Sequence, residues 1–408
     1  MENPEIKKED FGENFKWGVT ISAYQTEGAV DVDGKGENIW DRFSKRKGAI
    51  KTGENANLAN NFYNNYQEYF DLTNHLNFNN FGLSLAWSRI FPEGKGRINQ
   101  KGIDYYHKVI DALLESGLTP WVTLYHWDLP QKLEDQGGWT NREILGWFSD
   151  YVDLCTRVFG DKVKNYKVLN EPSAFCGFGY MTGEHAPGQK NLFAFLSAAH
   201  HANLCQAEGG RIAKANVKNG NIGTSFATFE VQPVNKKAIN VNAARRIDAV
   251  IQRMFVEPLV GLGYPYGEFP SMKLIEMFFK PGDEQKIKFD FDYLGIQYYC
   301  RLVGKFSLWP LVAFADEVPA KERGVPMNNM GFEIYPQGMY NVLKRYSSYP
   351  GVKRLIITEN GVCLDDMVEN GMVYDPVRIN FYKDYLSHAL KAKKEGINVE
   401  GFFCWSLM

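Results

Sequence analysis

Two glutamates in this chain each follow a short apolar segment that is typical of a β-strand. Glu171 ends the run Tyr-Lys-Val-Leu-Asn-Glu, and Glu359 ends the run Leu-Ile-Ile-Thr-Glu. Two carboxylates that face each other across a sugar are the minimum equipment for hydrolysing a glycosidic bond with retention of configuration. The rest of the sequence must therefore supply a fold that brings the two strand ends together.

Eight short apolar segments alternate with longer amphipathic segments along the chain. Near-continuous apolar character suits strands that are buried on both faces, as in a parallel sheet. Eight such strands with helical crossovers predict an α/β fold, a single (β/α)8 TIM barrel over residues 11–408, with residues 1–10 as a flexible N-terminal segment. A doubly wound open sheet is the alternative, but eight regular repeats without a nucleotide-binding glycine motif count against it. The predicted strands span residues 15–22, 78–87, 119–126, 165–171, 221–228, 291–299, 353–359 and 399–407.

Several of the amphipathic segments carry helix start and stop signals. Residues 99–116, 192–215 and 375–395 read as helices, and Gly117 is expected to end the first of them. The run Thr-Asn-Arg-Glu from Thr140 predicts a capping box at the start of a further helix.

Polar side chains stand where most of the predicted strands end. In an α/β barrel the active groups lie at the C-terminal ends of the strands. Any one of these residues could be a capping or turn residue, but so many on one rim indicate an active site. They are Gln25, Arg89, His126, Asp128, Asn170, Glu171, Tyr298, Tyr299 and Glu359.

Composition and charge exclude several classes of function. A net charge of −2 gives no electrostatic reason to expect nucleic-acid or membrane partners, and no apolar run is long enough for a membrane span. The first ten residues are charged and do not resemble a secretory signal. Six scattered cysteines without a Cys-x-x-Cys pair favour free thiols in a reducing cytoplasm. No metal-ligand spacing or phosphate-binding loop is present, so we expect no metal or organic cofactor.

Five motifs occur in a fixed order, at residues 15–29, 87–92, 123–130, 169–172 and 355–363. Together they resemble glycoside hydrolase family 1, the β-glucosidase and 6-phospho-β-glycosidase family, from about Phe11 to the last residue. The resemblance implies a retaining β-glycosidase that acts without a cofactor on small carbohydrates, namely β-glucosides or β-galactosides of short oligosaccharides or aryl glycosides.

The resemblance also assigns roles to single residues. Glu359 is similar to the nucleophile that forms the covalent glycosyl–enzyme intermediate, and Glu171 is similar to the acid/base. The acid must be neutral when substrate arrives, and a neighbouring carboxylate would raise its pKa as required. Tyr299 resembles the tyrosine that orients the nucleophile.

The remaining predicted residues bind substrate in the family. Asn170 resembles the ligand of the sugar 2-hydroxyl, Gln297 replaces the usual asparagine, and Phe332 stands at the position of an aglycone-stacking tryptophan. Trp405 resembles the platform under the sugar ring, and the other sugar-hydroxyl ligands are expected to be Gln25, His126 and Trp127.

One departure from the family pattern concerns the charge beside the nucleophile. Gly82 stands where the family typically has an arginine that helps to hold the nucleophile ionised. Arg89 belongs to a neighbouring motif and is expected to lie too far along the loop to substitute. Without a cation, Glu359 should be harder to keep charged.

A second departure concerns the end of the sequence. The chain ends at Met408, three residues after Trp405, where the family continues into an Asp-Asn-Phe-Glu-Trp stretch and a closing helix. We therefore expect a barrel that lacks the usual C-terminal closing helix. The two departures motivate an alternative function, a catalytically impaired or inactive sugar-binding relative. A large gain in turnover from Gly82→Arg would indicate an impaired enzyme, and sugar binding without turnover would indicate a binding protein.

Overall fold

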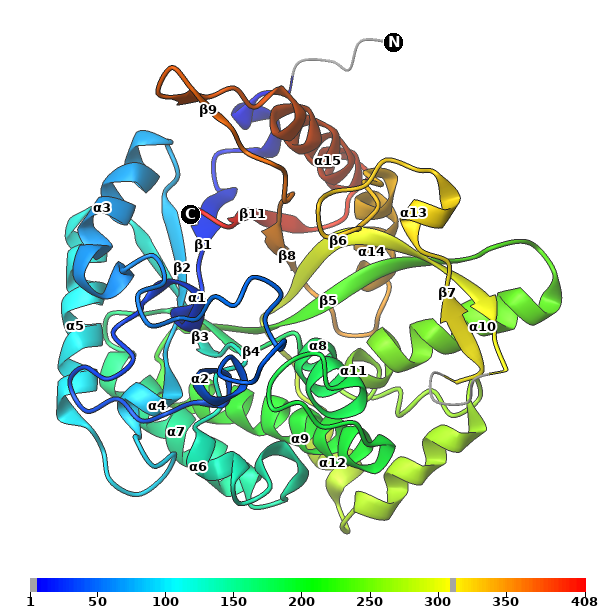
Figure 1. Cartoon of the computed structure of the whole chain (residues 1–408), viewed down its shortest axis with the longest axis horizontal. Coiled ribbons are helices and arrows are strands. Elements are labelled where there is room, and N and C mark those ends of the chain that lie inside the picture. Colours follow the sequence, from blue (N-terminus) through cyan, green and yellow to red (C-terminus); the bar gives the residue numbers. More distant parts are fainter. Residues whose placement is uncertain (1–5, 309–312) are drawn as a thin grey trace.

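The computed structural model describes residues 6–308 and 313–408, which form a closed barrel of eight parallel strands surrounded by helices (Figure 1). All eight predicted strands are confirmed. They pair in the order β5-β4-β3-β2-β1-β11-β8-β6, and pairing of β6 with β5 closes the barrel. The strands are β1 (Lys16–Thr20), β2 (Asn80–Ser84), β3 (Thr119–Tyr125), β4 (Asn165–Asn170), β5 (Asn221–Pro233), β6 (Tyr293–Phe306), β8 (Leu355–Asn360) and β11 (Val399–Trp405).

Three short strands lie outside the barrel ring. Strand β7 (Ala315–Glu317) adds antiparallel to the extended end of β6. Strands β9 (Val368–Glu369) and β10 (Met372–Val373) form a separate two-stranded hairpin. The long β5–β6 ribbon therefore projects beyond the barrel, as Figure 1 shows.

The larger helices follow the barrel strands in sequence and cover the outside of the barrel (Figure 1). They are α3 (Phe62–His75), α5 (Gln100–Glu115), α7 (Ile144–Phe159), α9 (Leu192–Asn216), α10 (Ala238–Asp248), α14 (Gln337–Ser347) and α15 (Pro376–Lys394). Short helices occupy the loops: α1 (Ala23–Thr26), α2 (Ile39–Phe43), α4 (Trp87–Ile90), α6 (Gln131–Glu134), α8 (Pro172–Cys176), α11 (Met254–Val256), α12 (Asp283–Ile287) and α13 (Ala320–Arg323). The 3₁₀ and π turns are η1 (Lys8–Phe11), η2 (Gly138–Thr140), η3 (Gly177–Thr182), η4 (Ala249–Arg253) and η5 (Pro270–Phe278).

The helices predicted at residues 99–116, 192–215 and 375–395 are confirmed as α5, α9 and α15, whereas one predicted helix start was wrong. Gly117 follows α5 with a φ of +75°, the left-handed conformation that ends a helix at glycine. The capping box predicted at Thr140 does not form. The Thr140 hydroxyl donates to the Gly137 carbonyl within η2, and α7 begins only at Ile144. A local turn therefore takes the side chain that the sequence pattern assigned to the helix start.

Large side chains fill the barrel below its C-terminal rim. Trp121 of β3 contacts Tyr293 of β6 and Phe403 of β11, with ring centroids 5.6 and 5.1 Å apart. These strands are not neighbours in the ring, so the contacts pass through the barrel interior. Gly18 of β1 admits this packing, because a Cβ there would lie 2.4 Å from the Phe403 ring. The barrel interior is thus filled with side chains, and the site lies above them at the C-terminal rim.

Residues 1–5 of the predicted N-terminal segment lie outside the described residues, and the extent of that segment stays a prediction. Residues after them form η1, whose Phe11 is buried against Phe15 with ring centroids 4.8 Å apart. None of the helices in the described part of the chain is long and apolar enough to cross a membrane.

Candidate active site

The two glutamates occupy the C-terminal ends of β4 and β8. Glu171 follows the last residue of β4 and precedes α8, and Glu359 is the penultimate residue of β8. Both side chains are buried. Glu171 has a φ of +49°, and its backbone N–H donates to the Ser225 carbonyl at 2.9 Å. A non-glycine residue in this conformation costs about 1–3 kcal/mol and persists where its surroundings fix it, often at an active site.

The electrostatic environments of the two carboxyl groups differ. Burial raises the pKa of Glu171 well above its ordinary value, and the charge of Glu359 raises it further. Burial also raises the pKa of Glu359, but the Lys167 ammonium and the Tyr299 hydroxyl oppose that rise. The arrangement therefore favours a protonated Glu171 beside an ionised Glu359.

Tyr299 of β6 contacts the second glutamate directly. Its hydroxyl donates to Glu359 Oε2 at 2.9 Å. Burial raises the pKa of Tyr299 well above its ordinary value, so the phenol remains a donor. The hydrogen bond fixes one oxygen of Glu359 and stabilises its charged form.

Asn170 connects four other residues of the site. Its Oδ1 accepts hydrogen bonds from Lys167 Nζ and Gln297 Nε2, both at 2.7 Å. Its Nδ2 lies 3.2 Å from His126 Nε2, and its backbone carbonyl accepts from Trp127 Nε1 at 2.9 Å. The structure thus brings three predicted residues, Gln297, His126 and Trp127, together around Asn170, with a lysine that was not predicted.

The hydrogen bonds of Asn170 also fix the tautomer of His126. An ammonium can only donate, so its partner on Asn170 must be the amide oxygen. The amide nitrogen then donates to His126 Nε2. Burial, with the nearby Lys167, holds the pKa of His126 well below its usual value. His126 is therefore neutral and carries its proton on Nδ1.

Trp405 ends β11 and lies against the imidazole of His126. The ring centroids are 5.5 Å apart, with 24° between the ring planes. Trp127 follows His126 in the sequence and has a φ of +74°. The centroid of its ring lies 5.6 Å from that of His126. The rings of Trp405, His126 and Trp127 therefore lie together beside Asn170.

Two predicted residues lie at the periphery of this network. Gln25 is on α1 with an exposed side chain, and its Oε1 accepts from the Ser22 hydroxyl. Phe332 is half-buried between α13 and α14, where its backbone is hydrogen-bonded to Asn328. Within the described residues, the hydrogen bonds of Gln25 and Phe332 do not reach the carboxylate pair.

Lys167 is the site residue that the sequence analysis missed. Its Nζ lies 3.7 Å from Glu359 Oε1, which is an ion-pair distance, and its side chain is buried. The sequence offered no basic partner for Glu359 at Gly82 or Arg89, and Lys167 supplies one. Burial still raises the pKa of Glu359, which agrees with the expectation that Glu359 is harder to keep charged. The available signal was a lysine inside an otherwise apolar strand, because a buried charge needs a partner.

Arg89 does not contribute to the carboxylate pair, as expected. Its guanidinium forms an ion pair with Glu27, with Nη2 3.0 Å from Oε2. It also lies over the rings of Tyr63 and Tyr105, at 4.6 and 5.3 Å from their centroids. Arg89 is fully buried in these contacts.

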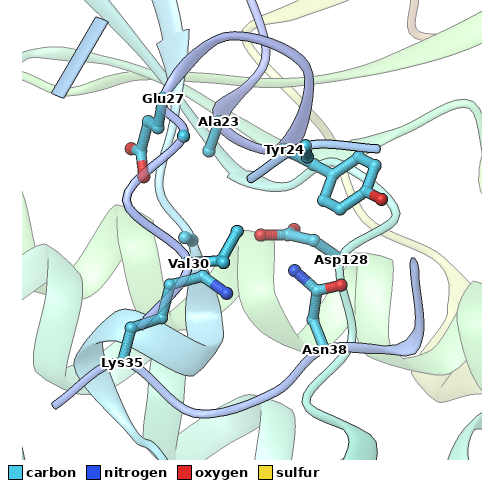
Figure 2. A pocket seen from close by; sticks show the side chains of 10 residues that line it. Ala23, Tyr24, Glu27, Val30, Lys35, Asn38 and Asp128 are labelled. Atoms are coloured by element: carbon cyan, nitrogen blue, oxygen red, sulfur yellow. The ribbon is translucent and has the colours of Figure 1, made fainter. Parts of the chain in front are cut away.

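Asp128, which was predicted on the same rim, points into a separate pocket. Figure 2 shows its carboxyl group near Lys35 and Asn38, with Glu27 lining the same pocket. Its two oxygens accept no side-chain hydrogen bond from the described residues. Burial raises the pKa of Asp128 to about 7. Asp128 is therefore a buried acid distinct from the Glu171–Glu359 pair.

Comparison with known proteins agrees with the fold and the motifs. The model of glycosyl hydrolase family 1 matches residues 7–408. β-Glucosidase A of Thermotoga maritima is 38% identical over 99% of this chain and 90% of its own length. β-Glucosidase A of Acetivibrio thermocellus is 34% identical over 99% of this chain and 90% of its own length.

Solved structures give the same result. The β-glucosidase of Thermotoga maritima in complex with glucoimidazole has a TM-score of 0.91 and 36% identity, over 97% of this chain and 89% of that one. The same protein in complex with deoxynojirimycin has the same TM-score, identity and coverage. The family match, these relatives and the barrel together show that the chain belongs to glycosyl hydrolase family 1.

Proposed function

We propose that the protein is a retaining β-glycosidase. Glu359 attacks the anomeric carbon and forms a covalent glycosyl–enzyme intermediate, while Glu171 protonates the leaving oxygen. Glu171 then removes a proton from the water that hydrolyses the intermediate. The observation that carries the proposal is the unequal environment of two buried carboxyl groups, one of which faces an ammonium group and a phenol.

The unequal environments support the division of roles. A nucleophile must be ionised, and Glu359 has Lys167 and Tyr299 as partners. A general acid must be protonated, and burial together with the charge of Glu359 raises the pKa of Glu171. After the first step the charge of Glu359 is lost in the ester bond. The pKa of Glu171 then falls, which suits its second role as a base.

The residues around Asn170 are proposed to hold the sugar. Asn170, Gln297 and neutral His126 present amide and imidazole groups that can hydrogen-bond hydroxyls, and Gln297 Oε1 has no partner among the described residues. Trp405 is the proposed platform for the apolar face of the ring. The other proposed contacts are Gln25 and Trp127 for the sugar and Phe332 for the aglycone.

The proposed substrates are β-glucosides or β-galactosides of short oligosaccharides and aryl glycosides. The names of the relatives support this class. Besides the β-glucosidases, a 1,4-β-D-glucan glucohydrolase of Thermotoga neapolitana is 34% identical over 98% of this chain. The Thermotoga maritima β-glucosidase has also been solved with galacto-hydroximolactam. The free cysteines favour a reducing compartment such as the cytoplasm.

The alternative, an impaired or inactive sugar-binding relative, loses its main electrostatic support. Of the two departures on which it rested, the electrostatic one was Gly82, which left Glu359 without the arginine of the family. Lys167 now stands beside Glu359 in the structure. The two functions differ in a simple readout: a sugar-binding protein would bind deoxynojirimycin but release no phenol from an aryl glycoside.

The test is hydrolysis of 4-nitrophenyl β-glucoside and β-galactoside by the protein and three variants. Glu359→Gln and Glu171→Gln are expected to lose about 10⁴-fold and about 10²-fold or more in turnover, respectively. Glu143→Gln, an exposed glutamate before α7, is the control and should be unaffected. The first product seen by proton NMR should be the β-anomer. Unchanged turnover in Glu359→Gln, or the α-anomer as first product, would overturn the proposal.

The same assay with 6-phospho-β-glucosides decides the sugar class. We expect hydrolysis of the unphosphorylated glycosides to be faster. Preference for the phosphorylated substrate would contradict the proposed substrate class while leaving the mechanism in place.

A further inference from the structure

Lys167 and Gly82 share one region of the barrel interior. They lie on β4 and β2, with β3 between them, and both line a small cavity together with Thr20, Thr123 and Thr358. Thr123 of β3 pairs in register with Lys167, and Gly82 pairs with the preceding interior position, Trp121. The lysine side chain therefore enters a space bordered by Gly82 and three threonines, as well as by the rings of Trp121, Tyr293 and Phe403.

The space beside Gly82 is too small for a side chain at position 82. A Cβ at position 82 would lie 2.6 Å from Thr20 Oγ1 and 3.0 Å from Thr20 Cβ. Real Cβ contacts are not this short, so the glycine leaves this part of the interior to groups from other strands. Lys167 is one of those groups, and it lies within ion-pair distance of Glu359.

We propose that Lys167 is the positioning residue of the nucleophile, supplying from β4 the positive charge that the family typically supplies from the arginine position of β2, here Gly82. The proposal rests on the proposed function, in which Glu359 is the nucleophile. It assigns to this chain a different strand as the source of the charge.

The contacts of Glu359 support this assignment. Tyr299 donates to Oε2, and Oε1 has no hydrogen bond among the described residues but faces Lys167 Nζ at 3.7 Å. Tyr299 and Lys167 thus stabilise the charge of Glu359 from its two oxygens, and the side chain of Asn170 also lowers its pKa. The lysine is itself held in place, because its Nζ donates to Asn170 Oδ1 at 2.7 Å and Gln297 donates to the same oxygen.

The charges around Lys167 also favour one protonation pattern. Burial lowers the pKa of Lys167, and the charges of Glu359 and Glu171 oppose that fall and favour the ammonium form, while His126 is neutral. One cation in a buried site balances one carboxylate. The second carboxyl group must then hold a proton, as a general acid requires. Lys167 therefore assists the division of roles as well as the charge of Glu359.

The experiment compares Lys167→Met and Lys167→Arg with the unchanged protein, using kcat/KM for an aryl β-glucoside as a function of pH. Lys167→Met should lose about 10²-fold or more in kcat/KM at neutral pH. The acidic limb of its pH profile should move to higher pH by about 1–3 units, because that limb reports the ionisation of the nucleophile. Lys167→Arg keeps the charge and should keep the acidic limb within about half a unit of its original position.

Lys164→Met is the matched control. Lys164 precedes the same strand, at the opposite end of the barrel, and its Nζ donates to the Gly160 carbonyl. This variant should leave both kcat/KM and the acidic limb unchanged. A general effect of removing a lysine from this region would move both variants alike.

A second readout does not depend on turnover. Carbon-13 NMR of labelled glutamate in a Glu171→Gln background follows the titration of Glu359 with and without Lys167→Met. The pKa of Glu359 should rise when the lysine is removed. If Lys167→Met does not fold, Lys167→Gln takes its place, because it retains a donor for Asn170 Oδ1 without the charge.

The outcomes separate this inference from the proposed function. If Glu359→Gln remains active, Glu359 is not the nucleophile and both proposals fail. If Glu359→Gln is inactive while Lys167→Met keeps kcat/KM within about threefold and an unchanged acidic limb, only the role of Lys167 is overturned. An identical Glu359 titration in the two NMR samples would overturn it as well.

Discussion

Two clusters of buried charge in this barrel are built differently. In one, Arg89 donates from Nε and Nη2 to Glu27 Oε2, at 3.1 and 3.0 Å, and Tyr106 donates to Glu27 Oε1 at 2.7 Å. In the other, one ammonium serves two carboxyl groups, and Lys167 lies 3.7 Å from Glu359. The first cluster matches one cation to one anion, whereas the second has an excess of acid.

The difference indicates what each cluster does. A buried ion pair with matched charges and several shared hydrogen bonds holds elements together, and here it joins the segment after β1 to α4 and α5. A buried pair of acids with one cation has at least one strongly raised pKa, which costs stability and is useful for proton transfer. The left-handed backbone of Glu171 adds to that cost. The Glu27–Arg89 cluster is therefore structural, and the Glu171–Glu359 cluster is catalytic in the proposed function.

Breaking the structural cluster is expected to give the largest effect on stability. Arg89→Met leaves Glu27 buried without a cation, which should lower the free energy of unfolding by about 3–5 kcal/mol. Urea denaturation followed by circular dichroism measures the loss. Lys167→Met should change the free energy of unfolding less, because Lys167 lies 3.7 Å from Glu359, which can take up a proton when the ammonium is removed, whereas Glu27 loses two hydrogen bonds from its guanidinium partner. Equal losses in the two variants would erase the distinction between the clusters.

Asp128 provides a third case, because it is a buried acid without an ion pair beside the Glu27–Arg89 cluster (Figure 2). Its folded pKa of about 7 lies above its unfolded value, so the folded state binds the proton more tightly. Its contribution to stability is present below the unfolded pKa and is lost as the pH rises through the folded one. Between pH 5 and pH 8, this loss should amount to about 2–3 kcal/mol of the free energy of unfolding, and Asp128→Asn should abolish it.

The measurement for Asp128 is the free energy of unfolding of both proteins at the two pH values. Glu143→Gln, whose side chain is exposed, provides the control for a lost carboxylate. An unchanged pH dependence in Asp128→Asn would show that Asp128 is ionised in the folded protein and has partners that stabilise its charge.

Gly82→Arg tests the catalytic cluster with a smaller expected effect. From the sequence alone, a large gain in turnover from this change would indicate an impaired enzyme, because the change restores the arginine of the family. The structure predicts a loss instead. The new side chain would collide with Thr20, and its charge would repel Lys167. We expect kcat/KM for an aryl β-glucoside to fall about tenfold, equivalent to about 1.4 kcal/mol.

The companion variant for Gly82→Arg is Gly82→Ala, which adds a Cβ but no charge. A smaller loss in Gly82→Ala would separate the steric effect from the electrostatic one. A clear gain in turnover from Gly82→Arg would show that Lys167 does not supply the charge that the nucleophile needs.

Sequence patterns predicted the parts of the fold that depend on periodicity. The eight strands were recognisable because buried parallel strands are apolar on both faces, and the ends of β4 and β8 placed Glu171 and Glu359 on one rim. The contact between Tyr299 and Glu359 also agrees with the family motif. These features are local in sequence or fixed by strand order.

Two of the three features that the sequence did not predict depend on contacts between distant segments, and the third depends on a local turn. Lys167 was read as one residue of an apolar strand, and its partnership with Glu359 requires the register of strands β4 to β8 around the barrel. Asp128 follows His126 by two residues but points into another pocket. Thr140 had the sequence of a cap, yet a local turn uses its hydroxyl. In each case geometry, rather than residue type, decides the partner.

The most direct test of Glu359 as the nucleophile is to identify the residue that becomes covalently attached to the sugar. The protein is incubated with 2-deoxy-2-fluoro-β-glucosyl fluoride, in which the ring fluorine slows hydrolysis of the intermediate and the fluoride leaving group allows it to form. Peptide mass spectrometry should find the fluoroglucosyl group on Glu359. Attachment to Glu171, or inactivation without any attached sugar, would contradict the assignment of Glu359 as the ionised nucleophile beside Lys167.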